Sequence, residues 1–173
     1  MPTSPEPPPH SNPRPPWVIV FIALGAMGSC AFVALPVAVY GLRSYLTRQR
    51  TAETQESVRA LSAGVAACAA RSRVSSGLPP TAEPVPRALA SISGRKYQSG
   101  GLDWQDEAYQ CARFKLAAVQ SAQLQWVRLS EREGYVRAAL DLDGDMSPEI
   151  VLEQTVSCSA EGRCTTGEVR EGP

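Results

Sequence analysis

The sequence predicts an α+β fold, in which one long N-terminal helix, transmembrane in its first half, packs against a small antiparallel sheet of four to five strands. Three observations support this fold. Residues 17–42 form a run of 26 residues without a single charge. A proline-free stretch with helical periodicity follows this run. Beyond residue 104, short segments rich in Val, Tyr, Trp and Thr alternate with turn residues, as strands do.

The first sixteen residues, MPTSPEPPPHSNPRPP, include eight prolines. Proline fixes φ and lacks a backbone N–H, so a segment this rich in proline does not join a regular helix or sheet. We therefore predict a disordered tail over residues 1–16.

The uncharged run 17–42 is long enough to cross a membrane. At about 1.5 Å per residue it gives about 39 Å of helix, more than the roughly 30 Å hydrocarbon core of a bilayer. A cleaved signal peptide is the alternative, but its apolar core has only about 7 to 15 residues and follows a basic region. We predict a transmembrane helix over 17–42, in which small residues such as Gly28 permit close helix approach and homo-oligomerisation.

The helix is predicted to continue over residues 43–74 as an amphipathic segment. Its apolar residues Val58, Leu61, Val65 and Cys68 follow one another at steps of three, four and three. This spacing places them on one face of a helix. We expect that face to pack against the sheet.

Residues 75–103 contain SSGLPPTAEPVPR and SISGRKYQSGG, whose proline, glycine and serine predict a connector. The sheet domain is expected over 104–170, with Trp104 and Trp126 in its core. Its strands are predicted in YQCARFKLAAV, which contains Tyr109, and then in AQLQWVRLSE, GYVRAALDL, PEIVLEQTVSC and RCTTGEVR.

Four cysteines lie beyond the apolar run, and they permit three pairings. The spacing CSAEGRC suits a local disulfide between Cys158 and Cys164, which leaves Cys68 and Cys111 as the second pair. Disulfides would place this part of the chain in an oxidising compartment. Free, buried cysteines are the alternative.

The stretch ALDLDGDMSPEIVLE has the pattern of a calcium-binding loop. Oxygen ligands fall at the first, third, fifth, seventh and ninth positions: Asp141, Asp143, Asp145, Ser147 through its backbone carbonyl, and Glu149. The sixth position is Met146 instead of glycine, and the twelfth is Leu152 instead of glutamate, so any Ca²⁺ binding should be weak. The alternative is a tight hairpin turn at Asp143 and Gly144 with solvated aspartates.

Charge and composition exclude several functions. Residues 51–173 carry thirteen basic and sixteen acidic residues, with no basic stripe for a nucleic acid. The one histidine, His10, lies in the tail, so no serine or cysteine beyond the apolar run has a histidine to activate it. We expect a protein that is not an enzyme.

Beyond these patterns, the chain resembles type IV pilin-like (pseudopilin-like) membrane proteins, of the kind abundant in myxobacteria. The apolar helix carries a proline past its middle, Pro36, and continues into TRQRTAETQESVRALSAGVAA. A proline-rich connector, the Asp103–Trp104 pair, Tyr109 and ALDLDGD follow in the same order as in that family. The resemblance implies a structural or accessory component of a type IV pilus or type II secretion-like surface assembly, with other pilin-like subunits as partners.

The chain departs from that family at its start. Aligned on Pro36, Arg14 and Pro15 lie where the family's peptidase cuts, and Ile19 lies where the family has a buried glutamate. The prepilin peptidase motif is therefore lacking, and we expect an uncleaved, membrane-anchored protein.

Two signals disagree about topology. Three arginines follow the apolar run and only one precedes it, which favours a cytoplasmic C-terminus. The cysteines and the family's orientation favour the opposite. We expect a single-pass inner-membrane protein with a cytoplasmic N-terminus and a C-terminal domain in the periplasm or at the cell surface. The alternative function is a solitary membrane-tethered binding or sensor module with a weak Ca²⁺ loop.

Overall fold

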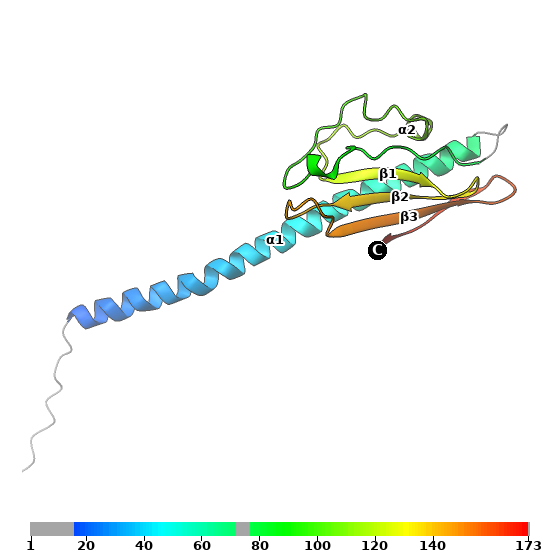
Figure 1. Cartoon of the computed structure of the whole chain (residues 1–173). Coiled ribbons are helices and arrows are strands. Elements are labelled where there is room, and N and C mark those ends of the chain that lie inside the picture. The colour runs from blue at the N-terminus through cyan, green and yellow to red at the C-terminus, as the bar shows by residue number, and fades with distance from the viewer. Residues whose placement is uncertain (1–15, 72–76, 173) are drawn as a thin grey trace, which may run out of the picture. The chain divides into compact units, whose positions relative to one another are not determined.

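The computed structural model describes the backbone of residues 16–71 and 77–172, and the side chains of 40–71 and 77–172. The chain divides into two compact units, Met1–Tyr45 and Leu46–Pro173. The described elements (Figure 1) are helix α1 (Pro16–Arg71), the 3-10 helix η1 (Leu89–Ser91), the short helix α2 (Glu107–Ala112), and the strands β1 (Ala122–Arg128), β2 (Glu133–Leu140), β3 (Ile150–Cys158) and β4 (Cys164–Glu171).

The predicted α+β class is confirmed by a long helix and a four-stranded antiparallel sheet. The strands lie in the order β1-β2-β3-β4, and each pairs with its sequence neighbour. In Figure 1, β1, β2 and β3 run side by side across the second half of α1. All four strands begin and end within a few residues of predicted segments, because period-two alternation and the intervening turn residues mark them in the sequence.

The core forms between one face of the sheet and one stripe of α1. The predicted stripe residues Val58, Leu61 and Val65 are fully buried, and Cys68 is 2% exposed. Alternate residues of each inner strand face this stripe, since successive side chains of a strand point to opposite faces. Trp104 and Trp126 are both buried in the core, as predicted.

Gly134 on β2 makes room for the largest of these core side chains. A Cβ atom at Gly134 would lie 2.5 Å from Cη2 of Trp126, closer than real Cβ contacts. The indole N–H of Trp126 donates to the carbonyl of Pro79 at 3.0 Å, so the ring is also fixed at its polar end. Burial of the ring therefore depends on glycine at position 134.

The predicted first strand, around Tyr109, is wrong: this segment forms the helix α2. Ala108, Tyr109 and Ala112 lie at helical spacing and are all buried, and Glu107 lies in the first turn, where the helix dipole favours an acidic residue. The Tyr109 hydroxyl donates to the carbonyl of Glu83 at 2.6 Å, which ties α2 to the connector. Burial raises the pKa of this hydroxyl above its ordinary value.

The connector has a structural role that its composition does not reveal. Its backbone runs along the outer edge of β1, where the N–H groups of Ala82 and Val85 donate to carbonyls of Trp126 and Leu124 at 3.0 and 2.8 Å. The N–H of Leu78 donates at 2.8 Å to the carbonyl of Glu131, in the turn after β1. An uncovered edge strand exposes unpaired backbone groups and invites aggregation. The connector therefore closes one edge of the sheet.

Both predicted disulfides are present. Cys68 on α1 is bonded to Cys111 on α2, and Cys158 is bonded to Cys164 across the turn between β3 and β4. The first joins segments 43 residues apart, and the second closes a loop with a separation of six. The alternative of free cysteines is wrong for these four residues.

The predicted tail 1–16 and membrane span 17–42, with Gly28 and Pro36, lie almost entirely outside the residues whose side chains the structure describes. Within the described part of the chain, no helix combines the length and the apolar character needed to cross a membrane.

Candidate functional site

The loop between β2 and β3, residues 141–149, brings the predicted acidic residues together. Oxygen atoms of four carboxylates lie within 4.8 Å of one another, one each from Asp141, Asp143, Asp145 and Glu149. The strands on either side fix the two ends of the loop, and the backbone N–H of Glu149 donates to the carbonyl of Leu140 at 3.0 Å.

Asp141 is the buried anchor of this loop, with only 2% of its surface exposed. Its Oδ1 accepts the backbone N–H of Gly144 at 2.7 Å, and its Oδ2 accepts that of Met146 at 2.9 Å. The hydroxyl of Ser93 donates to the same Oδ2. The Asp141 carboxylate therefore organises both its own loop and the turn that follows η1.

These hydrogen bonds stabilise the charged form of Asp141. The bond from the Ser93 hydroxyl is the largest cause that lowers the pKa of Asp141, with smaller contributions from the backbone N–H groups of Gly144 and Met146. Burial acts in the opposite direction but does not prevail. Asp141 is thus a carboxylate at neutral pH.

The backbone of the loop is sharply bent at two positions. Gly144 has φ of 88° and Met146 has φ of 71°, so Met146 adopts the left-handed conformation that glycine takes more readily. Met146 occupies the sixth position of the calcium-loop pattern, where glycine usually makes the turn. The chain makes that turn here with methionine, whose side chain is 65% exposed.

The separation of the four carboxylates suits one hard cation. Ca²⁺ holds oxygen ligands at about 2.3 to 2.6 Å, so two ligands on opposite sides of an ion lie about 4.6 to 5.2 Å apart. The 4.8 Å limit of the cluster falls in this range. Ser147, the fifth predicted ligand, follows in the same loop, and its N–H donates to Asp145 Oδ1 at 2.7 Å.

The tight hairpin turn of the alternative prediction at Asp143 and Gly144 is wrong, whereas the solvated aspartates of that alternative stay a prediction. The strands end at Leu140 and resume at Ile150, so these two residues lie inside a longer loop. The loop is longer than a tight turn because the backbone N–H groups of Gly144 and Met146 donate to the Asp141 carboxylate. Groups bonded in this way do not form the hydrogen bonds that would pair β2 with β3 further along.

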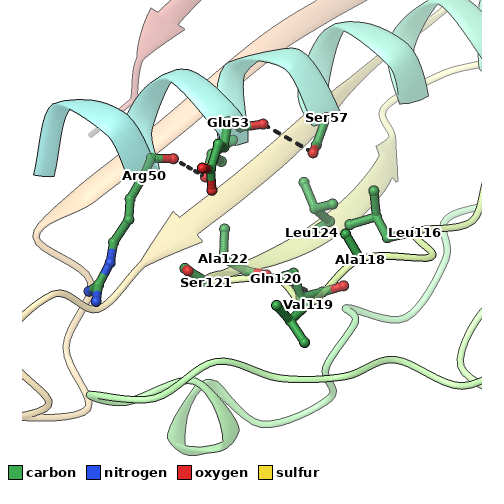
Figure 2. A pocket seen from close by; sticks show the side chains of 11 residues that line it. Arg50, Glu53, Ser57, Leu116, Ala118, Val119, Gln120, Ser121, Ala122 and Leu124 are labelled. Carbon is green, nitrogen blue, oxygen red and sulfur yellow. Dashed lines mark hydrogen bonds between the residues drawn. The ribbon is translucent and has the colours of Figure 1, made fainter. Parts of the chain in front are cut away.

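A second candidate is a pocket of about 170 Å³ between α1 and the segment 116–124 (Figure 2). Figure 2 shows Glu53 and Ser57 of α1 facing apolar side chains that include Leu116 and Leu124. The Ser57 hydroxyl donates to the carbonyl of Glu53 at 3.2 Å, so it is used within the helix. The amide N–H of Gln120 likewise donates to backbone carbonyls of the core.

The hydroxyl of Ser57 and the amide N–H of Gln120 therefore support the fold and do not form a pair of nucleophile and base. His10, the only histidine, lies outside the described residues. That the protein is not an enzyme stays a prediction. The acidic loop is the stronger candidate site, because one oxygen from each of its four carboxylates lies within 4.8 Å of the others.

Sequence reasoning missed one residue that shapes the site, Ser93. It lies 48 residues before Asp141, in a segment whose serine and glycine indicated only a connector. Gly94 next to it lies against the loop, since a Cβ at Gly144 would be 3.4 Å from the Gly94 nitrogen. No local pattern links the two segments, so only the folded chain reveals the contact.

Comparisons of this chain with family models, with curated proteins and with solved structures find no match.

Proposed function

We propose that the chain is a non-enzymatic, membrane-anchored, pilin-like protein, a structural or accessory component of a type IV pilus or type II secretion-like surface assembly. Its partners would be the membrane and other pilin-like subunits, including copies of itself. The uncharged run 17–42 would be the anchor, with the N-terminus in the cytoplasm and the unit Leu46–Pro173 in the periplasm or at the cell surface.

One observation carries this proposal: the uncharged run 17–42 lies within one continuous helix, α1, which begins at Pro16 and ends at Arg71. The described side chains of α1 in the core of the sheet domain, Val58, Leu61 and Val65, belong to the second half of this helix. A membrane around the uncharged run would give the first half its partner.

The disulfides support the proposed location. Both bonds lie in the unit Leu46–Pro173, and stable disulfides are typical of periplasmic and surface proteins. This weighs against the arginine count, which by the positive-inside rule favours the opposite orientation.

A second proposed function is calcium-dependent stabilisation of a solitary binding module. The convergence of four carboxylate oxygens within 4.8 Å favours it. Asp143, Asp145 and Glu149 are exposed and can turn toward an ion, while Asp141 supplies a fixed charged anchor. Extracellular calcium modules bind at about 10⁻⁴ to 10⁻³ M.

The experiment that separates the two functions is cross-linking of the full chain in intact cells, followed by gentle detergent extraction. Assembly of pilin type predicts a ladder of multimers, and sheared surface material that contains the chain. Monomers that extract alone and melt at a higher temperature in Ca²⁺ would favour the solitary module.

A variant at the surface of α1 tests where subunits meet. The variant Ala67→Asp changes an exposed position of α1 within the sheet-covered half and should leave both the fold and the anchor intact. Loss of the ladder in this variant alone would locate a subunit contact on that face of the helix. Monomers only, in the parent chain, would contradict assembly.

A further inference from the structure

The described side chains of α1 begin at Tyr40 with an exposed segment that is unusually rich in large apolar side chains. Eight large apolar side chains are exposed in the described part of the chain, and four of them lie within residues 40–46. They are Tyr40 at 77%, Leu42 at 61%, Tyr45 at 64% and Leu46 at 42% exposure. Such a concentration on a helix marks a surface that has a partner.

The segment 40–50, which contains these four residues, is also strongly basic. Arg43, Arg48 and Arg50 lie in it, and no acidic residue occurs between Tyr40 and Glu53. Among the described residues, the two ion pairs are formed by Arg87 with Glu83 and by Arg137 with Glu153, so none of these three arginines is neutralised by an acid. The segment offers three free positive charges.

The apolar and basic side chains surround the helix instead of forming one stripe. At 3.6 residues per turn, the seven side chains are spread around the axis with no gap wider than roughly 80°. A protein partner usually covers one face of a helix. A surrounding layer of lipid contacts every face, so this distribution favours lipid as the partner.

The chemistry of the segment fits one zone of a bilayer. Tyrosine places its ring among the acyl chains and its hydroxyl among the headgroups, and arginine reaches phosphate groups while its stem stays in the apolar layer. The uncharged run 17–42 ends within the segment, at Leu42. The segment thus lies where a helix that spans the hydrocarbon core would leave it.

We propose that residues 40–50 form an interfacial collar, with Tyr40, Leu42, Tyr45 and Leu46 as its apolar part and Arg43, Arg48 and Arg50 as its basic part, which binds the headgroups of anionic phospholipids. The inference rests on the proposed membrane anchor and names its lipid partner. The collar fixes the depth of the helix, because arginine phosphate contacts hold the segment at the membrane surface.

The test uses the full chain in phosphatidylcholine vesicles that contain a trace of spin-labelled phosphatidylglycerol or spin-labelled phosphatidylcholine. Electron paramagnetic resonance measures the fraction of each labelled lipid that the protein immobilises. We expect phosphatidylglycerol to be preferred by about fivefold or more, the effect of at least one arginine at an anionic surface. The preference should fall toward equality in high salt, which screens exposed charges.

Two variants make the result specific. R43Q/R48Q/R50Q should abolish the preference. The control R59Q/R113Q/R163Q removes the same charge from three exposed positions outside the collar and should keep it. All six positions lie outside the buried core, so both variants should melt like the parent chain.

Extraction with alkaline carbonate distinguishes failure of the collar from failure of the anchor. Resistance to extraction together with equal immobilisation of both lipids would overturn the collar and leave the anchor standing. Equal loss of preference in both triple variants would also overturn it, since net charge alone would then explain the effect. Release by carbonate would overturn the anchor and the collar together.

Discussion

The hydroxyl of Ser93 donates a hydrogen bond to the carboxylate of Asp141, a residue 48 positions further along the chain. This bond joins the turn after η1 to the loop between β2 and β3. It is also the largest cause of the lowered pKa of Asp141. The acidic loop is therefore held from outside as well as by its own backbone.

Removal of this hydroxyl should lower the stability of the unit Leu46–Pro173. The loss, measured against the parent chain at the same pH, should be larger at neutral pH than at acid pH. The folded pKa of Asp141 lies below its ordinary value of 3.8, so its contribution is fully present above 3.8 and is lost as pH falls through the folded pKa. Ser93→Ala raises that pKa. Thermal melts across acid and neutral pH should show the two chains converging in acid.

The matched control is Ser91→Ala. Ser91 lies two residues away, and its backbone N–H donates a hydrogen bond to the carbonyl of Ala88. This variant should melt like the parent at every pH. A difference between Ser93→Ala and the parent that stayed constant with pH would show that the hydroxyl acts by packing and not through the Asp141 charge.

Calcium should raise the melting temperature if the acidic loop binds it. At about ten times Kd, one site stabilises the folded chain by about 1.4 kcal/mol, or about 5 °C for a domain of this size. Asp143→Asn/Glu149→Gln should remove the shift and leave the metal-free melt nearly unchanged, since both side chains keep a hydrogen-bond acceptor. Asp141 is left intact because it supports the loop itself.

The control for calcium removes two acids from β4, Glu168→Gln/Glu171→Gln, both exposed and outside the loop. It should keep the full shift. A melt that does not change with Ca²⁺ up to about 10 mM, ten times the weakest expected Kd, would exclude the site.

The sheet should depend on the buried stripe of α1. Val65 is fully buried, so Val65→Asp places a carboxylate in the core without a partner, at a cost of about 4 kcal/mol or more. Total stabilities are about 5 to 15 kcal/mol, and we expect the domain to unfold. Ala67→Asp, at an exposed position of the same helix, should have little effect. An unchanged melt of Val65→Asp would refute packing of the sheet on this stripe.

The two disulfides should differ in their contribution to stability. On the loop-entropy relation, a separation of 43 residues predicts about 4 kcal/mol for Cys68–Cys111, and a separation of six predicts about 2 kcal/mol for Cys158–Cys164. Denaturant unfolding of the two double alanine variants measures both. Equal losses would show that the bonds act through the folded state and not through loop closure.

The sequence predicted the parts of the fold that follow from local periodicity. The buried stripe of α1 and the alternation of Ala122, Leu124 and Trp126 on β1 are both regular patterns, and both are found. Helix α2 was missed because a six-residue helix is too short to show a period, and its aromatic and apolar residues resemble a strand.

The parts that depend on contacts distant in sequence were not predictable. Nothing local pairs the connector with the edge of β1, or Ser93 with Asp141. Gly64 is a further case: a Cβ there would lie 2.7 Å from the Ala112 carbonyl, so this glycine permits α2 to approach α1 beside the Cys68–Cys111 bond. Its role follows only from the packed helices.

The acidic residues of the site were found because calcium loops have a fixed local spacing, and the structure brings the four carboxylates together. Their support from Ser93 was not found. The local pattern predicts the ligands, which stay a prediction, and the tertiary fold decides how rigidly the four carboxylates are held.

The most direct measurement is the accessibility of Cys158 and Cys164 in intact cells to a thiol reagent that cannot cross the inner membrane, with and without reductant. The proposed anchor and orientation predict no labelling before reduction and labelling from outside after it, because both residues are paired and only partly buried. Labelling that appears only after lysis, with free thiols, would place the domain in the cytoplasm and contradict a pilin-like surface protein.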